Sequence, residues 1–498
     1  MNPLFSVMPL LIVIASAVAT MLLSSSKRLT SAHFSPLIIA VLSVTLIFQL
    51  PMIGTVYSTL IYPDIFNRMI IADSFSSLFT LLFTLGTLFT LAISNRYLIA
   101  NPIFKGEFFA LILFALGGMI SLSMSYELIS AFIALETTSL SIYVLIGLNR
   151  TDPQSSEAFF KYLLIGSFAG TFFLIGTFLI YLQTGTTHLH EIGAFILTHP
   201  AEEIPLVVIG GALIMATILF KIGAFMFHSW VMDVYDGATM PVMMFMASTF
   251  KIAIFSIAIR IYLVDLYPIV HLYEFPLQVT AILTLLGGSF LTLAQTSVKR
   301  MLAASSIVHS GYILLALASF QGSYLLAGPS IIFYLIAYFL SLVGALGILS
   351  YISYVGHEHY TFEDFKGFSD IHPLLAACMT IFMLSLAGFP STIGFLGKFY
   401  LFSSALSSGH LAMTTAALFA AFVSIYYYFR LIAMIYFYGT DRPKLKIEFT
   451  LTTATISLIA ALTIWGGIGT SLLGFIPGAD GIIVYANQAI ESLTISTR

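Results

Sequence analysis

The sequence predicts an all-α polytopic membrane protein with about fourteen transmembrane helices. Of the 498 residues, 59% are hydrophobic and only 8% are charged, whereas an ordinary soluble domain carries roughly 25% charged residues. Apolar runs long enough for a crossing of about 20 residues fill nearly the whole chain. The basic residues gather on one side of the resulting helix map. These three observations exclude a soluble fold.

Residues 1–100 contain three apolar runs, at 4–24, 35–55 and 70–94. The first run is expected to be a retained helix. No basic residue precedes it, and the first one, Lys27, follows it, which is not the pattern of a signal peptide.

Residues 107–263 contain five further runs, at 107–124, 126–148, 159–183, 204–227 and 240–263. The run 204–227 is expected to be a broken helix, although the signal is weak. It offers Gly210, Gly211 and Gly223 but no internal proline.

Residues 276–439 contain another five runs, at 276–296, 301–320, 327–355, 371–405 and 411–439. The run 371–405 is interrupted by Gly388, Pro390, Gly394 and Gly397, so a clear break is expected there. Residues 450–498 hold the last run, 450–475, and a tail. No connection is long enough for a soluble core, so 1–498 is expected to be a single membrane domain.

The positive-inside rule orients this map, because cytoplasmic loops carry the excess of Lys and Arg. With the N-terminus outside, three basic residues fall outside, at Arg68, Arg260 and Arg498. Twelve fall on the cytoplasmic side, namely Lys27, Arg28, Arg96, Lys105, Arg150, Lys161, Lys299, Arg300, Lys366, Arg442, Lys444 and Lys446. Both termini are therefore expected to be periplasmic.

Composition also limits the chemistry. The net charge is −3, with no basic block, so nucleic acid is not an expected partner. The one cysteine, Cys378, cannot form an intrachain disulfide, a CxxC pair or a cysteine-ligated cluster. We expect no cofactor-binding residues and no metal ligands in this chain.

Four charged residues lie well inside the expected helices, at Glu136, Lys221, Lys251 and Lys398. A charge at the bilayer centre costs about 2.5 to 3.5 kcal/mol on insertion scales, so each needs a reason. Structural ion pairs between helices are the alternative, but three lysines cannot all pair with one glutamate. His309 is a proton carrier at mid-helix, although a single buried histidine is more often a hydrogen-bonded core residue.

Other polar residues have simpler interpretations. Arg430 lies near a helix end, where its side chain can reach the interface. Asp73 and Glu127 also lie near helix ends and are expected to be interfacial. Glu157 and Lys161 are four residues apart and predict a local helix pair.

An internal repeat gives the buried residues more weight. Lys398 follows Lys221 by 177 positions, His309 follows Glu136 by 173, and Arg430 follows Lys251 by 179. The fourth to eighth helices then form one five-helix unit and the ninth to thirteenth another. An odd number of helices inverts the second unit, and inverted repeats with broken helices are typical of transporters.

Proton transfer is the chemistry that suits these residues. Burial disfavours the charged form of a side chain and a nearby opposite charge favours it. Glu136 and Lys221 are the expected switch pair, with Lys251 and His309 relaying protons through water toward Lys398.

Several segments resemble, in order, the antiporter-like subunit N of bacterial respiratory complex I, over roughly residues 70–440. They are LETTSLSIYVLIGLNR, SSEAFFKYLLIGSF, FKIGAFMFHSWVMDVYDGATMPV, SVKRMLAASSIVHSGYILLA and LAGFPSTIGFLGKFYLF. After Lys221 the family commonly has more prolines. Here Met226, Met232, Thr239 and Met240 stand at several of those positions, and Pro241 remains.

The resemblance implies a proton-translocating membrane-arm subunit of an NADH:quinone oxidoreductase, with fourteen helices and two inverted five-helix repeats. It implies that Glu136, Lys221, Lys251, His309 and Lys398 occupy the family's proton-relay positions. FMN, iron–sulfur clusters and quinone are expected in partner subunits, and none in this chain. The expected partners are the antiporter-like subunit M and the small subunits K, J and A, in the bacterial inner membrane.

Three alternatives remain open. A subunit of a multisubunit cation/proton antiporter has the same fold and the same buried lysines. A haem enzyme needs facing histidine pairs, but of the eleven histidines only His309 is clearly mid-span. A purely structural subunit does not explain four buried charges.

Overall fold

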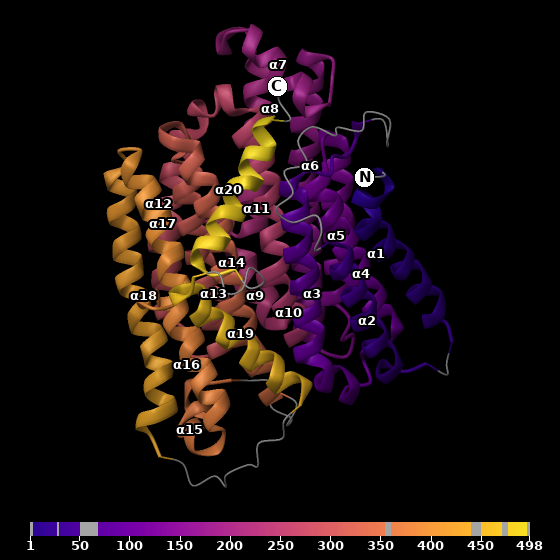
Figure 1. Cartoon of the computed structure of the whole chain (residues 1–498), viewed down its shortest axis with the longest axis vertical. Helices are drawn as coiled ribbons and strands as arrows, with labels where there is room; N and C mark the ends of the chain where they lie inside the picture. The colour runs from indigo at the N-terminus through magenta and orange to yellow at the C-terminus, as the bar shows by residue number, and fades with distance from the viewer. Residues whose placement is uncertain are drawn as a thin grey trace.

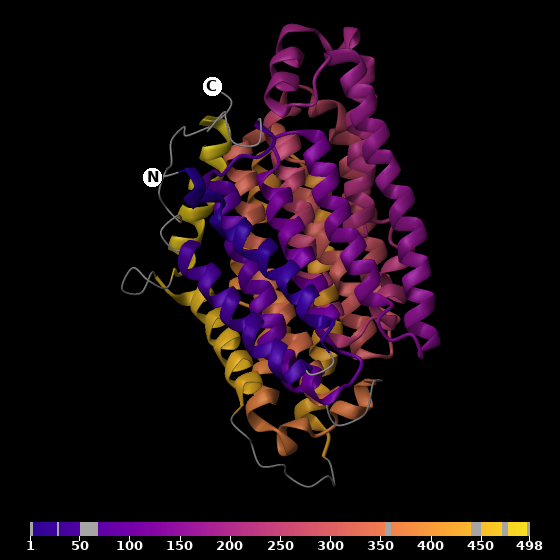
Figure 2. The same cartoon turned by 90° about the vertical axis from the view of Figure 1, so that its right-hand side faces the viewer.

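The computed structural model describes residues 3–26, 29–49, 68–353, 360–439, 450–470 and 477–495. Within these ranges the chain forms helices and three isolated β-bridges. The helices run roughly along the long axis of the molecule, as Figures 1 and 2 show. The predicted all-α membrane fold is confirmed, because thirteen helices are long and apolar enough to cross a membrane.

The first half of the chain follows the predicted order. Its three N-terminal helices are α1 (Pro3–Ser24), α2 (Ser31–Gln49) and α3 (Ser74–Ala100). The next elements are α4 (Gly106–Met124), α5 (Leu128–Ile146), α6 (Pro153–Thr184), α7 (Leu189–Thr198), η3 (Ala201–Glu203), α8 (Pro205–Ile222) and α9 (Ser229–Gly237). The predicted helix 240–263 comprises α10 (Met240–Phe245), the π-helix η4 (Met246–Phe250), α11 (Lys251–Arg260) and the π-helix η5 (Ile261–Asp265).

The second half begins after the short turn η6 (Tyr267–Ile269). It contains α12 (His271–Leu293), α13 (Val298–Leu317), α14 (Phe320–Ser353), η7 (Phe362–Phe365), α15 (Phe368–Ile371), α16 (Pro373–Ala387), α17 (Ile393–Ser407), α18 (Leu411–Phe437), α19 (Leu451–Ile468) and α20 (Ala479–Ile495). The short helix α7 and the C-terminal helix α20 were not predicted. α20 packs against α3 and α14, and its Ser492 Oγ accepts a hydrogen bond from the backbone N–H of Phe75 at 3.2 Å.

The predicted break in 371–405 is present, and it explains why thirteen helices meet the length requirement and not fourteen. The run consists of two 15-residue helices, α16 and α17, which both pack against α14. The run 204–227 is also broken, because α8 ends at Ile222 and α9 begins at Ser229. Figure 1 shows α8 and α16 starting from opposite ends of the molecule, as inverted repeats require.

Three membrane-spanning segments form the centre of the bundle. Every residue from Met240 to Leu263 is buried, and so are nearly all residues of α13 and of the segment 326–353 of α14, whereas most residues of α2 are not. Figure 1 shows α12 and α18 along one flank and α1 and α2 along the other. Two of the five predicted site residues, Lys251 and His309, lie on these buried segments.

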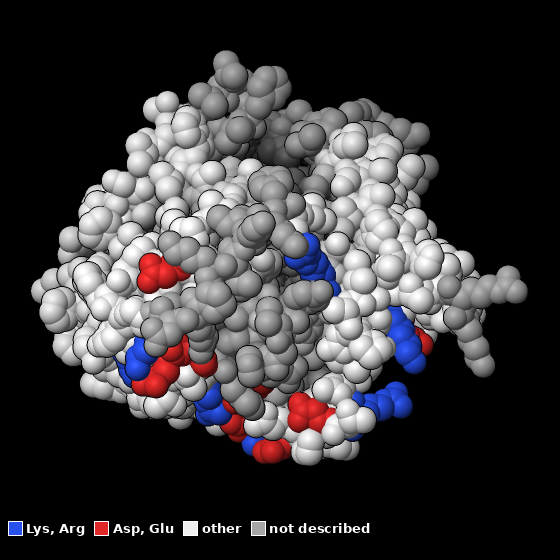
Figure 3. All heavy atoms as spheres, turned by 90° about the horizontal axis from the view of Figure 1, so that it is seen from below, with Lys and Arg blue, Asp and Glu red and all other residues white. Residues whose placement is uncertain are grey.

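Figures 1 and 2 both place the start of α1 and the end of α20 toward the end of the molecule opposite α15. The α15 end shows basic and acidic side chains around its rim (Figure 3). Of the basic residues assigned to the cytoplasmic side, Lys27, Arg28, Arg442, Lys444 and Lys446 lie outside the described residues, as does Arg498 on the other side.

Candidate functional site

Lys221 lies in the last turn of α8 and its ammonium contacts α5. Its Nζ donates hydrogen bonds to Ser139 Oγ at 2.9 Å and to Tyr143 Oη at 3.0 Å. The same nitrogen lies 5.3 Å from the centre of the Tyr143 ring and 5.9 Å from that of Tyr162. The helix end favours a cation, because its unpaired carbonyl groups carry partial negative charge. Lys221 is therefore held by hydroxyls, rings and a helix terminus.

Glu136 lies one turn before Ser139 on α5 and is the expected switch partner of Lys221. Among the described residues, no ion pair within 4.0 Å joins them, although the Lys221 charge acts on the carboxylate. The buried Glu136 Oε1 has no hydrogen-bond partner. It faces α6 at Gly170, where a Cβ atom would lie 2.5 Å from Oε1. A side chain at position 170 would displace this carboxylate, so the glycine leaves room for it.

Lys251 begins α11, immediately after the π-helix η4. Its Nζ donates to the carbonyl oxygen of Ser306 on α13 at 2.7 Å and lies 5.7 Å from the centre of the Tyr338 ring. A π-helical turn is rare and leaves carbonyl groups displaced from the regular ladder, frequently at functional positions. Lys251 thus has an acceptor on a neighbouring helix, and in the described part of the chain no carboxylate lies within 4.0 Å of its ammonium.

Ser310 connects the positions of Lys221 and Lys251 through α13. Its Oγ lies 3.0 Å from the carbonyl oxygen of Ile222, the residue after Lys221. It also lies 3.1 Å from the carbonyl oxygen of Ser306, which is the acceptor of Lys251. Ser310 thus connects the backbone next to Lys221 with the carbonyl group that accepts from Lys251, while the Lys221 ammonium itself contacts α5.

His309 is buried on α13 between two tyrosine hydroxyls. Its Nδ1 lies 2.6 Å from Tyr334 Oη on α14, and its Nε2 lies 2.9 Å from Tyr428 Oη on α18. The charges of both Lys398 and Lys251 act on the ring. Sequence reasoning identified the histidine but not its tyrosine partners, because tyrosines at ordinary helical spacing carry no signal of their own.

Lys398 lies on α17 and reaches back across the break. Its Nζ donates to the carbonyl oxygens of Leu386 and Ala387, both at 2.9 Å, at the C-terminal end of α16. The nitrogen also lies 4.9 Å from the centre of the Tyr312 ring. The ammonium group thereby pairs with carbonyls that the helix end leaves without intrahelical partners.

The predicted equivalence of Lys221 and Lys398 needs a correction. Both lie in the broken helix of their unit, but Lys221 precedes its break and Lys398 follows its break. An offset of 177 residues therefore pairs residues that occupy different places in the backbone. The offset that relates the two backbones is 165, because Gly223 and Gly388 both have positive φ, as do Met226 and Ser391.

Arg260 and Asp73 are polar residues whose role the sequence interpretation missed. Arg260 was expected in an external loop and Asp73 at the interface, but both are buried, with 3.0 Å between Arg260 Nη2 and Asp73 Oδ2. Arg260 Nη2 also donates to the carbonyl oxygen of Ser123 at 2.8 Å. The flanking Ile259 and Ile261 were a signal of burial. The pair ties α3 and α4 to α11.

Glu127 was also expected at the interface, but it is buried, and its Oε1 accepts a hydrogen bond from Thr187 Oγ1 at 2.6 Å. The local interpretations of Glu157 and Arg430 agree with the structure. Glu157 and Lys161 form an ion pair of 2.6 Å, which also includes Asp233 at 2.7 Å from Lys161. Arg430 Nη1 donates to the carbonyl oxygen of Gln295 at 3.4 Å and its guanidinium carbon lies 4.1 Å from the centre of the Phe362 ring. Arg430 is thus bound near the α15 end and is not part of the buried series.

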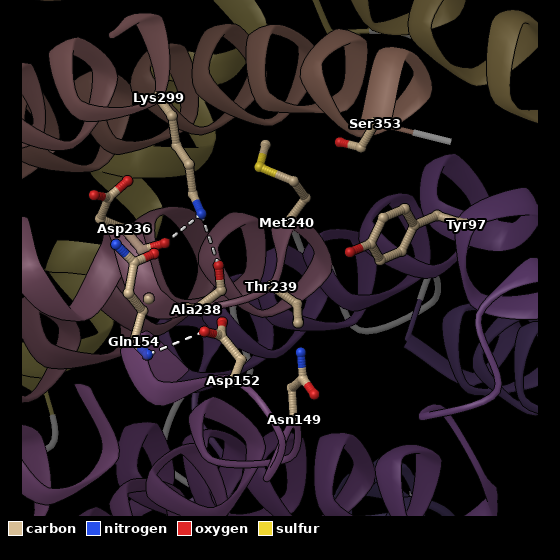
Figure 4. A pocket seen from close by; sticks show the side chains of 11 residues that line it. Tyr97, Asn149, Asp152, Gln154, Asp236, Ala238, Thr239, Met240, Lys299 and Ser353 are labelled. Atoms are coloured by element: carbon tan, nitrogen blue, oxygen red, sulfur yellow. Dashed lines mark hydrogen bonds between the residues drawn. The ribbon is translucent and has the colours of Figure 1, made fainter. Parts of the chain in front are cut away.

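A small polar pocket of about 30 Å³ lies at Lys299 (Figure 4). Lys299 is its most buried charged residue, and Lys299 Nζ donates to the carbonyl oxygens of Asp236 at 2.5 Å and Ala238 at 2.9 Å. The lining reaches Met240, the first residue of α10, which leads to Lys251. The full lining is Tyr97, Asn149, Asp152, Gln154, Asp236, Gly237, Ala238, Thr239, Met240, Lys299 and Ser353. No group of three or more possible metal ligands occurs among the described residues.

Residues 125–424 match the NADH:quinone oxidoreductase/Mrp antiporter transmembrane family. The NADH-quinone oxidoreductase subunit N of Trichlorobacter lovleyi is 35% identical over 426 residues, which is 86% of this chain and 85% of that protein. The chain belongs to the subunit N family of NADH-quinone oxidoreductase. The resemblance seen in the sequence motifs is therefore confirmed.

Two solved structures place this subunit N family member among known folds. A chain of respiratory complex I from Thermus thermophilus with bound aureothin is 29% identical, with a TM-score of 0.78 over 98% of this chain and 99% of that chain. A chain of the Mrp complex from Dietzia sp. has a TM-score of 0.85 over 100% and 99% at 20% identity. The Mrp chain is similar in fold alone, whereas the complex I chain is similar in both fold and sequence.

Proposed function

We propose that this chain is a proton-translocating membrane-arm subunit of a complex I-type NADH:quinone oxidoreductase. The observation that carries the proposal is the buried series Glu136, Lys221, Lys251, His309 and Lys398 at the centre of an inverted-repeat fold. Membership of the subunit N family supports it, as does the polar connection through Ser310. Ionisable groups buried in a membrane protein are expensive and mark ion pathways.

In this proposal protons enter from the α15 end, which is the cytoplasmic side. The polar pocket at Lys299 is open to water and borders the helix that leads to Lys251. Lys221 holds its proton while the Glu136 carboxylate is close, because opposite charges attract strongly in a low dielectric. Movement of Glu136 away from Lys221 promotes release, and the proton passes by way of Lys251 and His309 to Lys398, with water between the groups.

We also propose the setting in which the chain works. The chain forms one membrane domain, 1–498, in the bacterial inner membrane with both termini periplasmic. Its partners are the antiporter-like subunit M and the small subunits K, J and A. FMN, iron–sulfur clusters and quinone lie in partner subunits, so redox energy reaches this chain through its neighbours and the chain holds no redox centre.

The test uses the assembled complex in inverted membrane vesicles. Lys221→Met and Lys398→Met, alone and together, are expected to remove most of the NADH-driven proton uptake while the complex still assembles. Lys366→Met is the matched control, because Lys366 is a half-exposed lysine with a local partner, Glu363, at 3.1 Å. Full uptake in the double variant would contradict the proposal.

A subunit of a multisubunit cation/proton antiporter remains the second candidate, since the fold of the Dietzia Mrp chain is so similar. Purification of the native complex separates the two. Co-purification of a flavoprotein and iron–sulfur subunits supports the complex I assignment, whereas cation/proton exchange without them supports the antiporter.

A further inference from the structure

The buried link between Tyr334, His309 and Tyr428 joins three helices. Tyr334 Oη lies 2.6 Å from Nδ1 of His309, and Tyr428 Oη lies 2.9 Å from Nε2 of the same ring. All three side chains are buried. Both ring nitrogens of His309 are therefore used by hydroxyl groups that can each donate or accept a hydrogen bond.

Tyr334 lies directly beside the segment that carries Lys398. A Cβ atom at Gly397 would lie 2.8 Å from Tyr334 Cδ2, so the glycine before Lys398 leaves room for the tyrosine ring. Tyr428 comes from α18, on the outer flank of the bundle in Figure 1. The link thus extends from the Lys398 region through His309 toward α18.

The hydrogen-bond chemistry of this link allows two arrangements. A neutral imidazole has one N–H donor and one nitrogen acceptor. One tyrosine must therefore donate to the ring while the other accepts from it, and the opposite arrangement satisfies the same three groups equally well. The structure permits both arrangements without moving a heavy atom.

We propose that Tyr334 and Tyr428 act with His309 as a proton link that changes polarity with each transfer. A proton reaches Tyr428 Oη as that hydroxyl gives its own proton to Nε2. The Nδ1–H bond breaks and its proton passes to Tyr334 Oη, which releases its original proton toward Lys398. Each group gains one proton and loses one, so no net charge stays in the link. This inference rests on the proposed function and adds two residues to it.

One consequence makes this link slower to reset than a water chain, which also reverses its hydrogen bonds with each transfer but whose molecules rotate freely. After one transfer every hydrogen bond points the opposite way, so a second proton cannot follow in the same direction until the hydroxyls and the ring tautomer reset. The link therefore passes one proton per cycle, and it depends on an imidazole that can exchange its proton between two nitrogens.

The experiment measures NADH-driven proton uptake by the assembled complex in inverted vesicles. We expect Tyr334→Phe, Tyr428→Phe and His309→Gln each to lower the uptake rate by about tenfold or more, as expected when a proton-transfer group is lost. His309→Gln is the sharpest variant, because an amide can donate to one hydroxyl and accept from the other but cannot exchange its proton between the two sides. If His309 had a purely structural role, His309→Gln would keep normal uptake.

Tyr262→Phe is the matched control. Tyr262 is equally buried, lies outside the link, and its hydroxyl donates to the backbone carbonyl oxygen of Gly211 at 2.6 Å. Normal uptake in Tyr262→Phe and reduced uptake in the three test variants supports the link. Full uptake in His309→Gln or in either test tyrosine variant overturns it. The Lys221→Met/Lys398→Met variant is measured in parallel. If the double lysine variant retains uptake, the proposed function itself fails. If the double lysine variant loses uptake while the tyrosine and histidine variants keep it, only the tyrosine link fails.

Discussion

The two broken helices share a backbone and differ in where they carry their lysine. In both, a glycine with positive φ ends the first half, Gly223 at 71° and Gly388 at 83°. A second residue with positive φ follows three positions later, Met226 at 81° and Ser391 at 71°. Their capping hydrogen bonds also correspond, because the N–H of Ala224 bonds the carbonyl of Leu219 and that of Phe389 bonds the carbonyl of Leu384.

At this offset of 165 residues, Lys221 corresponds to Leu386 and Lys398 corresponds to Asp233. Lys398 binds the carbonyl oxygen of Leu386, so its ammonium reaches the backbone position that Lys221 occupies in the first break. Asp233 instead binds Lys161, away from the buried series. In both breaks a lysine is thus associated with the end of the first half-helix. Lys221 belongs to that half-helix, whereas Lys398 reaches it from the second half-helix. The shared requirement is a cation at the negative end of a helix.

The largest expected contrast is between Gly388→Ala and Gly223→Ala. Each places an L-residue at positive φ, at a cost of roughly 1–2 kcal/mol. At Gly388 the new Cβ would also lie 2.9 Å from Lys398 Cδ, whereas at Gly223 it would meet Val231 and not Lys221. We expect both variants to lower the apparent Tm of the complex and only Gly388→Ala to lower proton uptake by about tenfold or more. Equal uptake in the two would contradict this.

The acceptors of the two lysines provide the next contrast. Ser139→Ala and Tyr143→Phe each remove one hydrogen bond to the Lys221 ammonium, worth about 1.5–3 kcal/mol for a charged group. Lys398 has backbone acceptors, which no side-chain substitution removes. We expect roughly tenfold slower proton uptake in each variant. Ser141→Ala is the control, since the Ser141 hydroxyl donates to the carbonyl oxygen of Thr137 in its own helix and not to the Lys221 site. A similar loss in Ser141→Ala would mean that α5 is merely sensitive to change.

A smaller effect is expected at the glycines of α6, which have no counterpart in the Lys398 site. A Cβ at Gly170 would crowd Glu136 Oε1, and one at Gly166 would overlap the Tyr143 hydroxyl. Gly170→Ala and Gly166→Ala should each cost about 1–3 kcal/mol through overpacking and reduce uptake a few-fold. Proton-uptake assays and thermal unfolding of the complex measure the two effects. Unchanged uptake in both would show that neither side chain needs its present position.

The smallest effect is expected at the second strained position of each break. Met226→Gly and Ser391→Gly relieve a positive φ but add freedom to the unfolded chain, so the net gain in stability should be below about 1 kcal/mol. Met226 is 73% exposed, so no packing is lost there. A differential scan of the two variants should show Tm values at or slightly above that of the parent. A marked fall in either Tm would mean that the methionine or serine side chain holds the turn.

Much of the site could be predicted because buried charges are conspicuous against an apolar sequence. Glu136, Lys221, Lys251, His309 and Lys398 were identified in this way, as was the break marked by Gly388 and Pro390. The partners of these residues could not be predicted. Ser139, Ser306 and Ser310 resemble many other serines in helices, and backbone carbonyls carry no sequence signal at all.

The sequence by itself determined the membrane class, the helix order, the two units and the identity of the buried ionisable residues, because hydrophobicity and charge act locally along the chain. Only the tertiary structure decided which groups meet. It set Glu136 apart from Lys221, paired Arg260 with Asp73, placed His309 between two tyrosines and turned Lys398 back onto the end of α16. These contacts depend on how helices far apart in the sequence pack together, and close packing is a property of the assembled bundle and not of any single helix.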